Sequence, residues 1–314
     1  MYDWNRMLHL IVNEIDERIK DHDDEALTLK SLAKRLGYSE FHATRRFKDV
    51  SGMHLSDYIR LRKLAFALID VRDTQDSLFD IAVKYGFGSH EAFTRSFKTT
   101  YGITPKKYRQ NPLPVVLRTK LSIFDRYYLG LEEIGMATST RDVKTYFITL
   151  PAHLYLHIKN YESKGYWDFW KKQATIPGQN WDTICGLLDS IKGNLDGHVD
   201  VLCNYSGQVM ARMYEGNGAI AEGYGIRLPL DYKGPIPENM LVARIPEHDY
   251  IVFEHGPFDY EQENETVEKK LIDAELSFDY SKTGYSHDAS SGRVGYFYHI
   301  PALFKKRLEP VRRR

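Results

Sequence analysis

The first third of the chain contains one sequence pattern twice, and the two copies lie 49 to 50 residues apart. The first copy consists of residues 32–39, Thr44-Arg45, Phe47-Lys48 and Gly52, and the second of residues 81–89, Thr94-Arg95, Phe97-Lys98 and Gly102. Each copy has the form of a helix, a glycine-bearing turn and a second helix with outward basic residues, as in a DNA-reading helix-turn-helix. Two copies predict two insertions into the major groove.

The charge of the chain is unevenly distributed, although its formal net charge is zero. Residues 28–112 hold 16 Lys and Arg against 8 Asp and Glu, whereas the flanking segments are both acidic overall. A basic segment of this kind favours contact with the phosphates of nucleic acid. The zero net charge therefore does not argue against DNA binding.

Helical spacing and proline positions divide the chain into three zones. Apolar residues predict an amphipathic helix over residues 4–20 and a longer spacer helix over residues 55–71. Prolines stop the last helix near residue 112. We expect a DNA-binding domain at residues 1–112 with helix-turn-helix motifs at about 28–60 and 77–109, a linker and domain entry at 113–145, and a second domain at 146–314.

Cysteine content and hydropathy predict the compartment. Cys185 and Cys203 are too few for a disulfide framework, so we expect free thiols in a reducing environment. The sequence has no apolar run long enough to cross a membrane, and its start lacks the features of a signal peptide. We expect a cytoplasmic protein, and no motif in the chain indicates a cofactor.

Residues 5–112 resemble the DNA-binding domain of the AraC/XylS-type bacterial transcription regulators. The resemblance is carried by residues 80–89, 93–98 and 102–109, in which glycine, aromatic and basic positions coincide in order. It implies an all-α domain with two helix-turn-helix motifs and double-stranded promoter DNA as partner. RNA polymerase is a further candidate partner.

The spacing in each second helix separates buried from outward residues. Phe93 and Phe97, and likewise Ala43 and Phe47, are four residues apart and are expected to face the core. The residues expected to face outward are Glu40, Phe41, Thr44, Arg45 and Lys48 in the first copy and His90, Glu91, Thr94, Arg95 and Lys98 in the second.

Arg45 and Arg95 are the best candidates to read bases, because arginine binds guanine through two hydrogen bonds. The resemblance implies that Phe41, Thr44 and Arg45, and His90, Glu91, Thr94 and Arg95, occupy positions that reach base edges. Relatives often carry glutamine where His90 and Glu91 stand, so the resemblance does not define the target sequence. The alternative is a solvated basic helix face, which the paired Thr-Arg positions disfavour.

A second set of basic residues is expected to contact phosphates. Lys106, Lys107 and Arg109 would supply affinity that depends on salt. Arg60, Arg62 and Lys63 on the spacer helix either act in the same way or form a solvated face.

The last two thirds of the chain contain a second repeat, with an offset of 95 residues between residues 150–157 and 245–252. Helical stretches at 166–174 and 261–275, and strand-like runs at 209–214 and 293–299, lie between its landmarks. This arrangement predicts an α+β domain of two pseudo-symmetric β-α-β-β halves, in which the helices cover one face of a shared antiparallel sheet.

This duplicated domain resembles the GyrI-like effector-binding domain, and the whole chain is similar to Rob-like regulators. The resemblance rests on a His-x-Tyr sequence after proline in each half and on the stretch 250–257. It implies a groove that holds a small-molecule effector. Many relatives carry a glutamate for cationic ligands at the position of Phe297. The candidate ligand-binding residues are Tyr155, Trp167, Trp170, Glu222, Tyr250, Glu254 and Phe297.

Each of these candidates has a plainer explanation. The Trp residues can be core aromatics, and Glu222 and Glu254 can be surface carboxylates. His153 and His157 share one face of a strand and could approach one metal ion, but two ligands do not make a site, and duplication of His153 as His248 explains their presence. We therefore expect no metal site.

The sequence as a whole predicts a DNA-binding transcription regulator that senses a small molecule through its C-terminal domain and is not an enzyme. The alternative is a GyrI-like domain with hydrolase-type activity or with a protein partner, tethered to DNA. In the hydrolase alternative, Tyr250 and Glu254 would act as an acid and base pair. No nucleophile elbow, P-loop or zinc signature supports that alternative.

Overall fold

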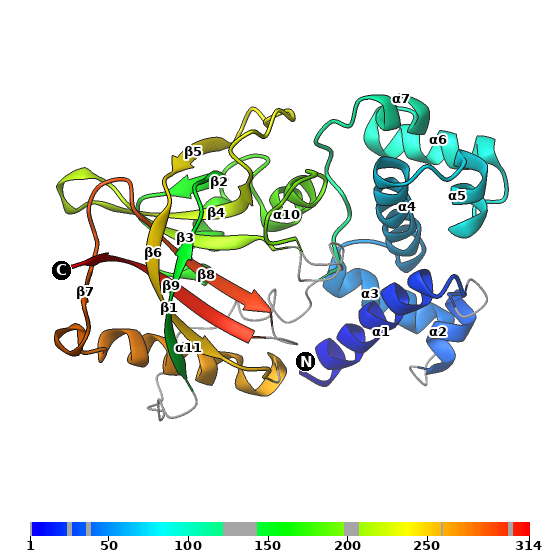
Figure 1. Cartoon of the computed structure of the whole chain (residues 1–314). Coiled ribbons are helices and arrows are strands. Elements are labelled where there is room, and N and C mark those ends of the chain that lie inside the picture. The colour runs from blue at the N-terminus through cyan, green and yellow to red at the C-terminus, as the bar shows by residue number, and fades with distance from the viewer. Residues whose placement is uncertain are drawn as a thin grey trace. The chain divides into compact units, whose positions relative to one another are not determined.

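The computed structural model describes residues 2–23, 27–35, 39–121, 143–197, 207–258, 260–300 and 304–314, and these fall into two compact units (Figure 1). The first unit contains the described residues up to 121 together with Trp181–Ile191. The second unit contains the remaining described residues. A helical first part and a sheet-rich second part agree with the multidomain fold class predicted from the sequence.

The first unit is helical. Its elements are α1 (Tyr2–Lys20), α2 (Leu29–Arg35), α3 (Glu40–Ser51), α4 (Leu55–Asp73), α5 (Leu78–Lys84), α6 (His90–Tyr101), α7 (Pro105–Gln110) and α10 (Trp181–Asp189). The central helix α4 packs against α1, α3, α5, α6 and α7. Tyr58, Leu64 and Leu68 on α4 are fully buried in a core that continues into both motifs. The predicted spacer helix is confirmed, and it holds the two motifs in one unit.

Helix α10 was not predicted from the sequence. It packs within the first unit, although in the sequence it follows the first two described strands of the second unit. The Leu117 N–H donates to the Gly186 carbonyl at 3.1 Å, and the Val115 N–H donates to Ser190 Oγ at 3.0 Å. A Cβ atom on Gly186 would lie 2.1 Å from the Leu117 carbonyl oxygen, so only glycine allows this approach. This division differs from the expected domain boundary at residue 112.

Arg62 is a structural residue, so both alternatives predicted for it, a phosphate contact and a solvated face, are wrong. Its side chain is fully buried, with Nε and Nη2 donating to the two carboxylate oxygens of Asp16 at 2.8 and 2.5 Å. Nη1 donates to the Arg118 carbonyl at 2.6 Å. A buried guanidinium requires such partners because an unpaired buried charge is very costly. Arg62 therefore joins α1, α4 and the segment after α7.

The second unit is built on one antiparallel sheet. Its strands are β1 (Lys144–Leu150), β2 (His153–Asn160), β3 (Val209–Tyr214), β4 (Ile220–Leu228), β5 (Leu241–Ile245), β6 (His248–His255), β7 (Tyr285–His287), β8 (Val294–Ile300) and β9 (Phe304–Arg313). Their order is β1-β6-β9-β8-β3-β4-β2-β5, and β7 pairs with β9. The helices α9 (Tyr166–Gln173) and α11 (Tyr260–Leu276) lie between strands in the sequence.

Strand register assigns both helices to the same face of this sheet. Directly paired residues share a face, and the pairs Tyr224–Met210, Met210–Phe297, Phe297–Arg307 and Arg307–Phe253 connect β4 to β6. Trp170 of α9 contacts Tyr224 with ring centroids 4.8 Å apart, and Val267 and Leu271 of α11 pack with Phe253. Figure 1 shows α11 lying along the sheet.

The opposite face of the sheet carries a tyrosine-rich core. Tyr155, Tyr250 and Tyr296 are at most 1% exposed, and they pack with Val252 and Leu308. The Tyr155 hydroxyl donates to the Val209 carbonyl at 3.0 Å. Part of the high tyrosine content therefore serves the core of this face, where large aromatic rings bury much apolar area.

Candidate DNA-binding surface and candidate ligand sites

Helices α3 and α6 are built from the same parts. The side chains of Ser39 and Ser89 cap the two N-termini, accepting from the third residue along at 3.3 and 3.1 Å. Gly52 and Gly102 end the helices with φ angles of 78° and 75°, a left-handed conformation that favours glycine. Both helices therefore begin and end at matching positions of the repeat.

The two helices also bury the same face. Ala43 and Phe47 of α3, and Phe93 and Phe97 of α6, are buried as predicted. The predicted outward residues are exposed or half-buried: Glu40, Phe41, Thr44, Arg45 and Lys48 on α3, and His90, Glu91, Thr94, Arg95 and Lys98 on α6. Their periodicity leaves a polar and basic face on each helix that a major groove can accommodate.

The two faces differ in their first turn. Phe41 is 76% exposed, an unusual position for a large apolar ring without a partner. At the matching position of α6 stands Glu91, whose carboxyl pKa is lowered by hydrogen bonds from its own backbone and from Ser89. Phenylalanine can contact a thymine methyl group, whereas a carboxylate accepts from the cytosine amino group. The two helices therefore present different chemistry at equivalent positions.

A hollow of about 460 Å³ lies beside Arg95, lined by Arg60, Phe87, Ala92, Arg95, Ser96 and Thr99. Arg60 extends from α4 to within 3.5 Å of the hydroxyl groups of Ser96 and Thr100. It thus adds positive charge beside the recognition helix. A backbone phosphate next to Arg95 would meet this charge.

The residues predicted to contact phosphates at α7 do not share one environment. Lys106 and Lys107 are exposed, whereas Arg109 is half-buried and its Nε donates to the Val71 carbonyl at 3.0 Å. This contact joins α7 to α4. Arg109 is therefore engaged in packing, and the two lysines are the side chains of this set that remain available to DNA.

The seven predicted ligand residues do not come together in one site. Tyr155, Tyr250 and Glu254 lie on the tyrosine-rich face of the sheet, according to strand register. Glu222 and Phe297 lie on the helix-covered face, where α9 contributes Trp167 and Trp170. Because alternate residues of a strand point to opposite faces, one groove cannot be lined by both sets.

An aromatic cluster with one carboxylate forms on the helix-covered face. The rings of Tyr166, Trp170 and Tyr224 contact one another with centroids 4.8 to 6.4 Å apart, and Trp167 meets Tyr166 at 4.9 Å. The Glu222 carboxylate accepts from the Gly165 N–H at 2.9 and 3.0 Å. Burial raises the pKa of Glu222, so its charge is poorly solvated. Aromatic faces with a carboxylate suit a cationic group.

Phe297 occupies an arginine-rich position at the centre of the same face. The guanidinium groups of Arg212 and Arg307 lie 5.2 and 4.1 Å from its ring centroid. Both arginines also form ion pairs with Glu275, at 3.1 and 2.5 Å. This centre is filled by protein charges, and it offers no carboxylate at the position where relatives carry the glutamate.

The acid and base pair of the hydrolase alternative does not form. Tyr250 is buried, and burial raises its pKa above the ordinary range. Glu254 instead accepts a hydrogen bond from the Tyr146 hydroxyl at 2.6 Å. His153 also has structural partners, because its Nε2 and Nδ1 lie 2.7 Å from the Tyr296 hydroxyl and the Pro151 carbonyl.

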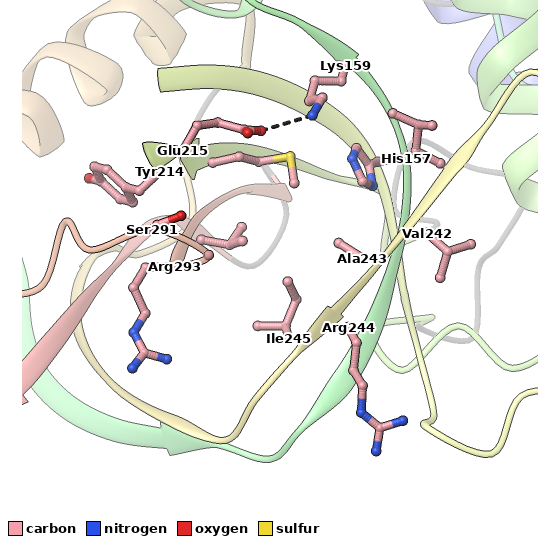
Figure 2. Close-up of a pocket in the computed structure, with 14 residues that line it drawn as sticks. His157, Lys159, Tyr214, Glu215, Val242, Ala243, Arg244, Ile245, Ser291 and Arg293 are labelled. Carbon is pink, nitrogen blue, oxygen red and sulfur yellow. Dashed lines mark hydrogen bonds and ion pairs between the residues drawn. The ribbon is translucent and has the colours of Figure 1, made fainter. Parts of the chain in front are cut away.

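A pocket that sequence reasoning did not predict opens beside the tyrosine-rich core (Figure 2). Its volume is about 360 Å³, and its walls come from β2, β3, β5 and the segment Ser291–Val294 that leads into β8. None of the seven predicted ligand residues lines it.

Among the described residues there is no group of three or more His, Cys, Asp or Glu arranged to hold a metal ion. In the same residues, no helix combines the length and apolarity needed to cross a membrane.

Comparison with known proteins connects the first unit to DNA-binding proteins. Residues 32–111 match the helix-turn-helix domain family. The transposon Tn10 TetD protein of Escherichia coli is 36% identical over 112 residues, a match that covers 36% of this chain and 81% of TetD. The Right origin-binding protein of Escherichia coli K12 is 38% identical over 102 residues, covering 32% of this chain and 35% of that protein.

A solved structure, the C-terminal domain of the two-component response regulator yesN from Fusobacterium nucleatum, shares 32% identity. The match covers 32% of this chain and 94% of that chain, with a TM-score of 0.29. The paired motifs, together with the family match and the likeness to TetD, define a double helix-turn-helix DNA-binding protein. The chain belongs to the AraC family of transcription regulators.

Proposed function

We propose that this protein regulates transcription by reading an asymmetric promoter sequence with α3 and α6, under the control of a small molecule that binds the second unit. The observation that carries the DNA-reading part is the matched exposure of Thr44, Arg45 and Lys48 with Thr94, Arg95 and Lys98. Two reading helices in one chain allow a monomer to contact two major grooves about 34 Å apart.

Selection of bound sequences from a random DNA library at near-physiological salt tests this reading. The full chain is expected to enrich one asymmetric site, and Arg45→Ala and Arg95→Ala are each expected to relax the preference at a different base pair. If both variants instead bound all sequences more weakly and to the same extent, the two arginines would contact phosphates only, and base reading would be refuted.

For small-molecule sensing, the aromatic cluster around Glu222 is the part of the predicted ligand set that supports the proposal. Tyr166, Trp170 and Tyr224 provide ring faces, and Glu222 provides a poorly solvated carboxylate. A ligand with an aromatic and cationic group fits this chemistry. Trp170 and Tyr224 are 2% and 8% exposed, so the same rings also pack in the core of this face.

Strand order supports the proposal that this unit consists of two related halves. Apart from α10 in the first and β7 in the second, β2-α9-β3-β4 and β6-α11-β8-β9 follow the same β-α-β-β sequence. The order β2-β4-β3 on one side of the sheet centre matches β6-β9-β8 on the other. β5 pairs with β2, and β1 pairs with β6, so each half borrows the strand that precedes the other. A groove at the centre of such a pair would be lined by both halves.

We propose that α10 transmits the effect of ligand binding to the first unit. Residues 174–180 connect it to α9. Regulation requires that the ligand bind two states of the protein with different affinity. Titration of the full chain with benzyltrimethylammonium, with and without its selected DNA site, tests this coupling. Equal affinity in both cases would refute sensing at this cluster, and Glu222→Gln should abolish any difference.

A further inference from the structure

The pocket beside the tyrosine-rich core contains one buried polar atom that the fold does not use. His157 on β2 lines this pocket, and its side chain is only 2% exposed. Its Nδ1 lies 3.0 Å from the Tyr155 carbonyl oxygen, and because only an N–H can bond a carbonyl, Nδ1 carries the proton. Nε2 is therefore an acceptor, and within the described residues it has no hydrogen-bond partner.

Duplication does not explain His157. The repeat offset of 95 residues places Val252 at the matching position of the other half, where it is 1% exposed in the same apolar core. A valine thus satisfies the packing requirement of this position. His157 keeps a stacked contact with Tyr155, with ring centroids 4.7 Å apart and planes 6° apart. A buried acceptor without a partner carries an energetic cost that a ligand donor would remove.

The rest of the pocket is apolar at its base, and the charged side chains at its rim form ion pairs. Met213, Ile245 and Val294 are each at most 7% exposed and form the base. Lys159 at the rim is paired with Glu215 at 2.9 Å, and Arg244 and Arg293 also line the pocket (Figure 2). Arg293 is also paired, with Asp288 at 2.9 Å, and strand register places the Arg244 side chain on the other face of β5. Glu215, the carboxylate among the lining residues, is therefore already paired, which disfavours a cationic ligand. Thioether and aromatic groups attract each other, which favours an aromatic ring beside Met213.

We propose that this pocket binds a phenol-type molecule whose hydroxyl group donates a hydrogen bond to Nε2 of His157 and whose ring lies on Met213, Ile245 and Val294. This pocket lies on the opposite face of the sheet from the Glu222 cluster, because His157 and Tyr155 alternate with residues that face α9. The inference goes beyond the proposed function, because it adds a second ligand site to the same unit. Binding itself requires no DNA.

The test compares 2-naphthol with 2-methoxynaphthalene, in which a methyl group replaces the donor hydrogen, titrated by fluorescence into the full-length protein. The wild type is expected to bind 2-naphthol about tenfold more tightly, because only the hydroxyl satisfies the buried acceptor. His157→Phe retains an aromatic ring against Tyr155 but lacks Nε2. This variant is expected to bind both probes with equal affinity, at the level of 2-methoxynaphthalene.

A second variant keeps the test decisive if His157→Phe fails to fold. Ala243 on β5 lines the pocket and is half-buried, so Ala243→Trp should fill the space and abolish binding of both probes. Leu276→Trp adds the same bulk at a residue that is 78% exposed and outside the pocket, and it should bind like the wild type. Equal affinity of the wild type for the two probes, or unchanged binding by Ala243→Trp, would overturn the proposal.

Measurement of DNA affinity with and without 2-naphthol separates this inference from the proposed function. Specific 2-naphthol binding with unchanged DNA affinity would establish the site and refute its regulatory meaning. Changed DNA affinity that His157→Phe abolishes would establish both. Loss of sequence selection in the library experiment would refute DNA reading without affecting the pocket.

Discussion

The chain contains two internal repeats, and they differ in where the repeated residues lie. In the first unit, Thr44-Arg45 and Thr94-Arg95 are on outward helix faces. In the second unit, the repeated Tyr155 and Tyr250 are 0% and 1% exposed. Packing accounts for repeated buried residues, since a duplicated fold needs the same core twice. Repeated exposed residues need a different explanation, and contact with a partner is the one that helix-turn-helix geometry provides.

The largest effect is expected from the buried repeat. Tyr155→Ala and Tyr250→Ala should each lower the free energy of unfolding of the second unit by about 3 to 5 kcal/mol, because each removes a fully buried ring and leaves a cavity. Urea denaturation followed by circular dichroism measures this loss. Tyr146→Ala, at a 38% exposed residue of the same sheet, is the matched control and should cost far less. A loss below about 1 kcal/mol for Tyr250→Ala would contradict the structural role of this repeat.

The exposed repeat should affect DNA discrimination and leave stability unchanged. Arg45→Ala and Arg95→Ala should each reduce the preference for the cognate base pair by about 1 to 3 kcal/mol, since each removes a guanidinium that can hold a guanine. Competition binding with single-base variants of the selected site measures this preference. The comparison between the two repeats would fail if either substitution lowered the free energy of unfolding as much as Tyr250→Ala.

His157, at which the second repeat is imperfect, predicts that the free energy of unfolding depends on pH. Burial lowers the pKa of His157 from 6.5 to about 4, so the unfolded chain takes up a proton at a higher pH than the folded one. The stability from this residue is present above pH 6.5 and is lost as the pH falls toward about 4. Between pH 7 and 5 the loss is about 2 kcal/mol.

The variant His157→Val copies the residue of the other half and should lack this loss. Urea denaturation of both proteins at pH 7 and pH 5 isolates the effect, because other titrating groups contribute equally to each. A parallel decline of the two proteins would show that His157 does not titrate as its burial implies.

The smallest effect is expected from the repeated lysines. Lys48→Ala and Lys98→Ala should weaken binding to all DNA sequences to a similar extent, and each should reduce the slope of log affinity against log salt by about 1. Binding titrations from low to moderate salt measure the slope. A change in base preference without a change in slope would move these lysines from phosphate contact to base reading.

Local sequence signals predicted the first unit well. The buried pairs Ala43 and Phe47, and Phe93 and Phe97, are each four residues apart in one helix, so periodicity alone identifies them. Arg62 was assigned incorrectly because its partner Asp16 lies 46 residues away. Contacts at such a separation leave no periodic signal in the chain.

The candidate ligand residues were less predictable for a related reason. Tyr155 and Glu222 are both near repeat landmarks, but strand register places them on opposite faces of the sheet. Register is a property of pairing between distant strands, so one sequence does not reveal it. The pocket at His157 was missed because its walls come from four separate segments. The mismatch between His157 and Val252 in the repeat is the signal that could have indicated it.

Helix α10 has a consequence for how such a protein can be rearranged in evolution. The polypeptide enters the second unit, returns to place Gly186 against Leu117 in the first, and only then completes the sheet. A single crossover near residue 112 would therefore transplant a DNA-reading part without the helix that packs on it. The carbonyl of Ser190, which accepts from Arg72, and the N–H of Leu121, which donates to the Tyr58 hydroxyl, would have to find new partners in the chimera. Inheritance of the two units as a pair is the arrangement that keeps these contacts.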